Sequence, residues 1–333
     1  MVKLLQIWFR GKMKAIPVCN LLRQSKTLFS LFVAISCVMT YFPYKMLRNY
    51  HESLSVQTHD VAGELSMSKP INVIVEKLYN ESTNDQLVIA IGSGITSRKL
   101  QNVSAENVEV KFQFFQAFLP TFCNTASPHF IYKVYLAFDN NDVVFANQLL
   151  RDAFKRHFYI MTTTGSCGDR RITAELSLVE CSYTGKPAWA QNDAMLEAYL
   201  DHVDYLYRIN DDTKLLTRGW TEKFISKLES YNPPRVGVVG PYVIGSQQIF
   251  LTYEFVHRTH IDIFGFYYPH VFTDWYADTW LSFVYESLKK CTSLIDVRLI
   301  HTKMLGRRYD GHVKTKILLD RHNLAENTAL INR

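Results

Sequence analysis

The stretch Tyr205-Leu206-Tyr207-Arg208-Ile209-Asn210-Asp211-Asp212 is a short, mostly apolar run that ends in an amide and two adjacent acids. A run of this length closed by turn-forming residues is typical of a buried β-strand. Two acids at the end of a strand concentrate negative charge, which solvent or a bound cation must compensate. Hard divalent cations such as Mg²⁺ or Mn²⁺ are held by a few carboxylates together with substrate phosphates. An ordinary Asp-rich turn is the alternative interpretation of these residues.

The rest of the chain alternates between strand and helix patterns. Apolar runs that fit buried strands lie at 87–91, 130–138, 158–161 and 205–209. Helical spacing of apolar residues covers 105–122, 143–157 and 188–201, whereas 163–186 is rich in loop-forming residues. This alternation predicts an α/β fold in which helices flank a mostly parallel central sheet. Ligands bind such folds where the strands end in loops.

The positive charge of the protein is confined to its first residues. The 37 Lys and Arg exceed the 31 Asp and Glu by six. Residues 1–26 contain no acid and six bases: Lys3, Arg10, Lys12, Lys14, Arg23 and Lys26. The remainder is therefore neutral and has no basic surplus of the kind that marks nucleic-acid binding. A hydrophobic content of 47% excludes a disordered chain.

An uncharged segment, Thr27–Tyr44, follows these bases. As a helix it would be about 27 Å long, close to the thickness of a membrane's hydrocarbon core. We therefore expect a basic cytosolic tail at 1–26, a transmembrane signal anchor at 27–44, a stem at 45–85 and a lumenal domain at 86–333. A cleaved signal peptide and a buried core helix are the alternatives for 27–44.

A lumenal location is compatible with two sequons, at Asn80 and Asn102. An oxidising compartment also makes disulfides possible, and Cys167 with Cys181 is the first pair to test. Three pairings are open to the four cysteines of the expected lumenal part, which are Cys123, Cys167, Cys181 and Cys291. None of their spacings indicates a zinc site.

From residue 186 onward the motifs follow a recognisable order. Lys186–Ala198 and then 205–212 resemble the helix, strand and DxD motif of the GT-A fold of nucleotide-sugar glycosyltransferases. The segments that follow in the usual order of this fold are Leu215–Trp220 with an amphipathic helix, and Val236–Pro241. Ala277-Asp278 resembles the later xED motif, and His301 is similar to the C-terminal metal-binding histidine. The resemblance covers about residues 86–312 and extends to type II membrane enzymes of the Golgi.

The resemblance implies a metal-dependent glycosyltransferase. Its donor would be a nucleotide-diphosphate sugar, a UDP-sugar in the first place, and its acceptor a glycan or glycoprotein in the Golgi or ER lumen. Asp212 and His301 would hold Mn²⁺ or Mg²⁺, with His312 as the rival of His301. Asn210 and Asp211 would lie against the donor.

Two positions depart from the motifs of this fold. Asn210 replaces the first acid of DxD, and Ala277 replaces the acid that precedes Asp278. Asp278 is then the candidate general base, and Asp274 is its nearby substitute. A helix-start acid that is stabilised by the helix dipole is the structural alternative for Asp278.

Further candidates follow from the ends of the first strands and from an aromatic stretch. Gly92 and Ser93 allow a close backbone approach to a nucleotide, and Asp139 and Asn192 are placed to contact it. Residues 264–276 contain seven aromatic side chains, whose faces suit sugar rings. Among them we expect Trp275 to be exposed and to bind the acceptor.

Two other functions stay open at this point. The departures at Asn210 and Ala277 also fit a non-catalytic GT-A-like lumenal protein that binds glycans or partner transferases. A nucleotidyltransferase that releases pyrophosphate is the third possibility. No pattern in the sequence indicates the oligomeric state.

Overall fold

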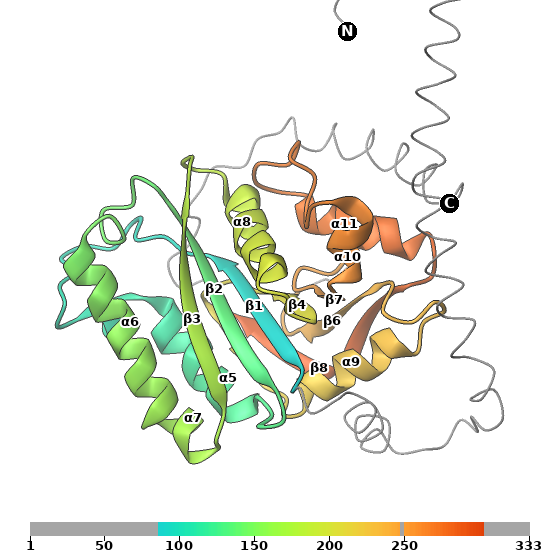
Figure 1. Cartoon of the computed structure of the whole chain (residues 1–333), viewed down its shortest axis with the longest axis horizontal. Coiled ribbons are helices and arrows are strands. Elements are labelled where there is room, and N and C mark those ends of the chain that lie inside the picture. Colours follow the sequence, from blue (N-terminus) through green and yellow to red (C-terminus); the bar gives the residue numbers. More distant parts are fainter. Residues whose placement is uncertain (1–85, 247–249, 303–333) are drawn as a thin grey trace, which may run out of the picture. The chain divides into compact units, whose positions relative to one another are not determined.

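A mixed eight-stranded sheet forms the centre of the computed structural model, which describes residues 86–246 and 250–302. Its strand order is β3-β2-β1-β4-β7-β6-β8-β5 (Figure 1). The strands in chain order are β1 (Val88–Gly94), β2 (Ile131–Asp139), β3 (Thr173–Cys181), β4 (Tyr205–Arg208), β5 (Thr213–Leu215), β6 (Val238–Val243), β7 (Phe255–His257) and β8 (Cys291–His301). The predicted α/β class is therefore confirmed.

Parallel pairing is confined to parts of the sheet. β3, β2, β1 and β4 are parallel neighbours, as the alternation of strands and helices predicts. β7 is antiparallel to both β4 and β6, β8 is parallel to β6, and β5 is antiparallel to β8. The expectation of a mostly parallel sheet thus holds for the β1–β4 part, while the sheet as a whole is mixed.

Helices cover both faces of the sheet because successive residues of a strand point to opposite sides. In β1, Ile89 and Ile91 pack into one core and Ala90 into the other. The first core includes α4 (Val108–Lys111), the π-helix η2 (Phe114–Phe118), α5 (Leu119–Thr125), α6 (Gln148–Thr163), α7 (Ser166–Asp169) and α9 (Trp220–Glu229). The second includes α8 (Pro187–Leu200), α10 (Thr259–Phe264) and α11 (Ala277–Glu286). Figure 1 shows the two groups of helices on either side of the strands.

Two of the predicted elements are wrong. Residues 158–161 are not a strand but belong to the end of α6. Phe158 faces the core there, whereas Tyr159 and Ile160 are exposed, so this apolar run is not buried on both sides. β3 lies within the stretch that we expected to be loops. It pairs with β2 alone and alternates polar and apolar side chains, so it lacks the continuous apolar run of a central strand.

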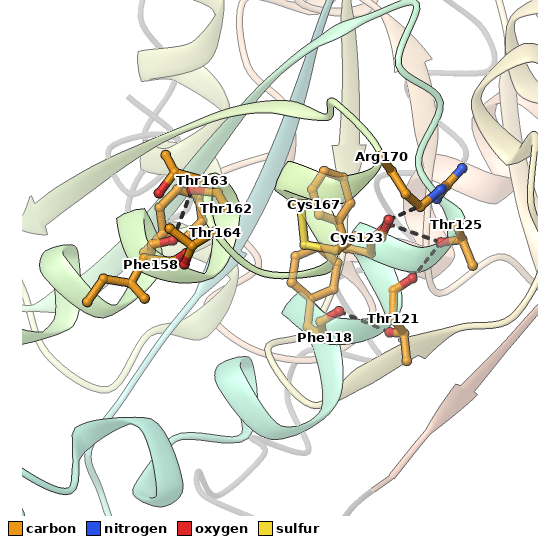
Figure 2. The surroundings of a disulfide bond; sticks show 12 residues. Phe118, Thr121, Cys123, Thr125, Phe158, Thr162, Thr163, Thr164, Cys167 and Arg170 are labelled. Carbon is orange, nitrogen blue, oxygen red and sulfur yellow. Dashed lines mark hydrogen bonds between the residues drawn. A yellow bond between two sulfur atoms is a disulfide. The ribbon is translucent and has the colours of Figure 1, made fainter.

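The disulfide joins Cys123 of α5 to Cys167 of α7 (Figure 2). Arg170 donates a hydrogen bond to the Cys123 carbonyl oxygen at 2.8 Å and adds a second link between these segments. The expected pair of Cys167 with Cys181 is wrong, because the two lie in the cores on opposite faces of the sheet. Cys181 is a buried free thiol.

Several predictions lie outside the described residues, namely those on the tail, the anchor, the stem, Asn80 and His312. The second sequon residue, Asn102, is described and exposed. Among residues 86–246 and 250–302, no helix has the length and apolar character needed to cross a membrane.

Candidate active site

Strand pairing places the two predicted metal ligands side by side. Asp212 precedes β5, and β5 pairs with β8 in a register that sets Thr213 opposite His301. The His301 Nε2 atom consequently lies 3.0 Å from Asp212 Oδ1. Thr302 fixes the backbone of the same turn, since its N–H and its hydroxyl donate to the Asp212 carbonyl oxygen at 3.1 and 2.9 Å.

Asn210 and Tyr253 complete this group, which we call the strand-end cluster (Asn210, Asp212, Tyr253 and His301). The Asn210 amide donates to the Tyr253 hydroxyl at 3.3 Å and lies 3.5 Å from His301 Nε2. The Tyr253 and His301 rings are 6.2 Å apart between centroids. Asp211, the middle residue of the motif, is buried.

The strand-end cluster fits a cation that is shared with a ligand. Within the described residues, no group of three or more His, Cys, Asp or Glu side chains could form a metal site from protein atoms alone. Asp212 supplies an oxygen and His301 a nitrogen, and Mg²⁺ typically takes one or two carboxylates and completes its shell with phosphate and water. Asp212 and His301 could therefore supply two ligands to a metal, and its remaining ligands would have to come from water or a bound molecule.

A cavity of about 300 Å³ contains the candidate base and the candidate acceptor residue. Asp278, Asp274 and Trp275 all line it. Trp275 is 52% exposed, as the sequence predicts. The cavity is also lined by Gln191, Arg208, Phe250, Tyr276, Ala277 and Thr279.

Asp278 lies in the first turn of α11. Its Oδ1 atom accepts a hydrogen bond from the Thr279 N–H at 2.8 Å. Burial raises the pKa of Asp278, and the guanidinium of Arg208 opposes that rise. The Asp274 carboxylate accepts a hydrogen bond from the Trp275 backbone N–H at 2.6 Å.

Sequence reasoning missed two charged residues, Arg208, which lines this cavity, and Glu254, which interacts with Arg208 and Asp278. Arg208 is the last residue of β4 and is 8% exposed, and its Nη1 donates to the Thr252 carbonyl oxygen at 2.5 Å. Glu254, just before β7, is fully buried, and its Oε2 accepts from the Tyr268 hydroxyl at 3.0 Å. Burial raises the pKa of Glu254 to about 8 against the opposing effect of Arg208. An arginine inside an apolar strand was the available signal, whereas nothing in the sequence around Glu254 marks it.

The predicted nucleotide residues of β1 are buried among protein atoms. A Cβ added at Gly92 would lie 2.7 Å from the Met195 Cε atom, so glycine there allows α8 to pack closely on β1. Ser93 is buried, and its hydroxyl donates to the Gly94 carbonyl oxygen at 3.0 Å. These contacts account for both residues structurally, and their nucleotide role stays a prediction.

Asp139 and Asn192 also have partners within the protein. Asp139 Oδ2 accepts from Arg98 at 3.2 Å and from the Gly185 N–H at 3.0 Å. The Asn192 amide binds both backbone groups of Tyr268, donating to its carbonyl oxygen at 2.7 Å and accepting from its N–H at 2.6 Å. Asn192 therefore clamps the aromatic stretch to α8, and nucleotide contact by either residue stays a prediction.

Comparison with known proteins yields structural neighbours only. No protein-family model matches the chain, and no curated protein matches it. Among solved structures the chain is similar to TarS of S. aureus. The crystal structure of TarS 1–349 aligns with a TM-score of 0.45 at 9% identity, over 73% of this chain and 65% of that one.

Two further TarS structures give similar values. The complex of TarS 1–349 with UDP aligns with a TM-score of 0.42 at 9% identity, over 65% of this chain and 61% of that one. A third TarS crystal structure aligns with a TM-score of 0.41 at 10% identity, over 73% of this chain and 43% of that one. This chain thus spans less than two thirds of each neighbour's length. Because all three TM-scores are below 0.5, these similarities support no conclusion about function.

Proposed function

We propose that the protein is a glycosyltransferase that moves a sugar from a nucleotide-diphosphate donor, a UDP-sugar in the first place, to a hydroxyl of a glycan or glycoprotein. One observation carries the proposal: β4 and the turn that follows it connect the cavity of Asp278 to the strand-end cluster. Arg208 lines the cavity, and two residues later Asn210 begins the strand-end motif. Tyr253 links the two regions. Its hydroxyl accepts from Asn210 of the cluster, and its ring centroid lies 6.0 Å from the guanidinium carbon of the cavity residue Arg208.

In this proposal the strand-end cluster binds the donor diphosphate. Asp212 and His301 would hold Mn²⁺ or Mg²⁺, which neutralises the charge that develops on the leaving diphosphate. Asn210 offers an amide where the motif of the resembled fold has a carboxylate, so the site is less negative toward the phosphates. Asp211 would lie against the donor beside Asn210.

The cavity beside it would receive the acceptor. A volume of about 300 Å³ lies at the lower end of the range for small-molecule sites. The Trp275 indole offers an amphipathic ring to the C–H face of a sugar. Asp278 would take the proton from the attacking hydroxyl, and Asp274 would hold the backbone of Trp275 in place through its N–H.

The proposed setting is the lumen of the Golgi or ER, with a single-pass type II anchor at residues 27–44. This part of the proposal rests on the sequence alone, on the six bases before an uncharged segment.

A turnover assay tests the proposed function. The full chain is incubated with a panel of nucleotide sugars and Mn²⁺, and release of nucleoside diphosphate is measured with and without glycan acceptors. We expect turnover with at least one donor, and a loss of about 100-fold or more in kcat for Asp278→Asn, because removal of a general base typically costs 10²–10⁴. Asp274→Asn is the matched control and should lose much less. Equal losses for the two variants would contradict the assignment of the base.

The second candidate is a non-catalytic GT-A-like protein that binds glycans. The amide of Asn210 beside His301 is the observation that favours it. This candidate predicts retention of the full chain on a glycan array, with no effect of Mn²⁺ and nucleotide on the melting temperature.

A further inference from the structure

One guanidinium and two carboxyl groups interact beside the cavity. Arg208 interacts electrostatically with both Glu254 and Asp278, and the two acids raise each other's energy when both are ionised. The Arg208 backbone N–H donates to the Glu254 carbonyl oxygen at 2.9 Å, so strand pairing fixes the relative positions of the two backbones. Arg208 is 8% exposed and Glu254 is fully buried.

Glu254 and Arg208 each have a buried polar atom that lacks a hydrogen bond among the described residues. Glu254 Oε2 accepts from Tyr268, whereas Glu254 Oε1 and Arg208 Nε are buried and make no hydrogen bond within the part of the chain that the structure describes. Glu254 and Arg208 consequently do not form the two-bond pair that would compensate a buried carboxylate. A buried charge without such compensation is costly, so the neutral acid is the favoured form of Glu254.

Asp278 is better placed than Glu254 to stay ionised. It lines the cavity and lies in the first turn of α11, where the helix dipole favours negative charge. The Thr279 N–H also donates to its carboxylate. With one guanidinium for two acids, the charge of Arg208 compensates Asp278 fully only while Glu254 is neutral.

We propose that Arg208 and Glu254 are positioning residues for Asp278: Glu254 stays the neutral acid, which leaves the positive charge of Arg208 to Asp278 and keeps Asp278 ionised in the cavity. The inference deepens the proposed function and rests on it, since Asp278 is the base of that reaction. The pair acts on the reaction through the proton affinity of Asp278 and does not touch the reacting atoms.

The other titratable groups around Glu254 stay neutral between pH 5 and 8. They come from β4, from the segment after α10 and from β8, and they are Tyr207, Tyr267, Tyr268 and Cys291. Burial raises the pKa of each tyrosine, and it raises the pKa of the Cys291 thiol to about 12. The charge balance around Glu254 in this range is therefore set by Arg208, Asp278 and Glu254 itself.

A melting experiment on Glu254→Gln tests the charge state without any assay of activity. Glutamine keeps an acceptor for Tyr268 and cannot ionise. Glu254 loses its proton near its ordinary pKa of 4.5 in the unfolded chain and near 8 in the folded chain. The contribution of Glu254 to wild-type stability is therefore fully present below pH 4.5 and is lost as the pH rises to about 8. The Tm of the full-length variant minus that of wild type should rise steadily from pH 5 to pH 8 and level off above it.

Glu229→Gln is the matched control. Glu229 Oε1 accepts from the Tyr205 hydroxyl at 2.8 Å and pairs with Arg235 Nε at 2.7 Å, so it has a close arginine partner in addition to a tyrosine. Its amide variant should melt below wild type from pH 6 to 8. If Glu254→Gln also melts below wild type throughout this range, Glu254 is an ionised partner of Arg208 and the inference is overturned.

The pH dependence of turnover tests the effect on Asp278. In Arg208→Gln the acid limb of kcat/KM should move to higher pH by about one unit or more, because the compensating charge is gone. Arg208→Lys should restore most of the shift. An acid limb that stays in place in Arg208→Gln overturns the inference. Absence of turnover with every donor contradicts the proposed function instead, so the two failures are distinguishable.

Discussion

Two buried acids at opposite parts of the sheet have contrasting surroundings. Asp142, after β2, accepts five hydrogen bonds, from Thr96 Oγ1, from the Ser97 N–H and hydroxyl, and from the N–H groups of Val144 and Phe145. Glu254, before β7, accepts one at its carboxylate. An acid whose acceptor sites are filled by its own and a neighbouring loop is an element of the scaffold, whereas an acid with an unfilled site next to a cavity-lining arginine is a candidate for function.

The same contrast holds for the regions around the two acids. The β1–β3 part contains the disulfide and the larger aromatic core on its α5 and α6 side. The β4–β7 part contains Arg208, Glu254 and the cavity of Asp278. In the proposed function, the first part is the scaffold and the second contains the reacting groups.

Removal of the disulfide should have the largest effect on stability. The bond links residues 44 positions apart, and a loop of this size corresponds to about 4 kcal/mol of lost unfolded-state entropy. Cys123→Ser with Cys167→Ser should therefore lower the free energy of unfolding by roughly this amount in urea titrations. Cys291→Ser, which removes a free thiol, is the control. A loss below about 1 kcal/mol would show that packing alone fixes α5 against α7.

Asp142→Asn should have the next largest effect, about 2–3 kcal/mol of destabilisation, because the amide nitrogen would face donors that now bind a carboxylate oxygen. Thermal melts at pH 7 measure it. Glu254→Gln is the matched change, from acid to amide at a buried site, and should raise the Tm at this pH. If both variants lost stability equally, the distinction between the two acids would be wrong.

The candidate site residues show what the sequence can and cannot predict. Asp212, His301 and Asp278 belong to short motifs, and the structure brings Asp212 to His301 and places Asp278 in the cavity. Glu254 has no motif, because its environment is made by Arg208 and Tyr268, which come from distant strands and loops. Pairing across the sheet decides such contacts, and a single sequence does not encode it locally.

The errors in secondary structure have the same origin. β3 is an edge strand in which polar and apolar residues alternate, and it follows a Gly- and Thr-rich segment. The loop-forming composition of that segment therefore hides the alternating pattern of the strand. The predicted pair of Cys167 with Cys181 is wrong because the two residues are close in sequence but face opposite sides of the sheet. The order of strands and helices from β1 to β4 was otherwise predictable, since long apolar runs and helical spacing dominate there.

Trp275→Ala should have the smallest effect on stability. The side chain is 52% exposed, and exposed substitutions usually change the free energy of unfolding by less than about 0.5 kcal/mol. With a glycan acceptor, its KM should rise several-fold while hydrolysis of the donor alone is unchanged. Phe272→Ala, at a fully buried position of the same stretch, is the contrast and should lose about 3 kcal/mol or more. An unchanged acceptor KM in Trp275→Ala would remove the indole from the acceptor site.

We propose that Asp212 and His301 form a metal site that a nucleoside diphosphate completes. Calorimetric titration of the full chain with UDP, in the presence and absence of Mn²⁺, tests it most directly. We predict that wild type binds UDP at least ten-fold more tightly with Mn²⁺, and that Asp212→Asn and His301→Gln both lose this difference while melting as cooperatively as wild type. UDP binding that is the same with and without Mn²⁺ in the wild-type chain, or an intact Mn²⁺ effect in both variants, would contradict the account.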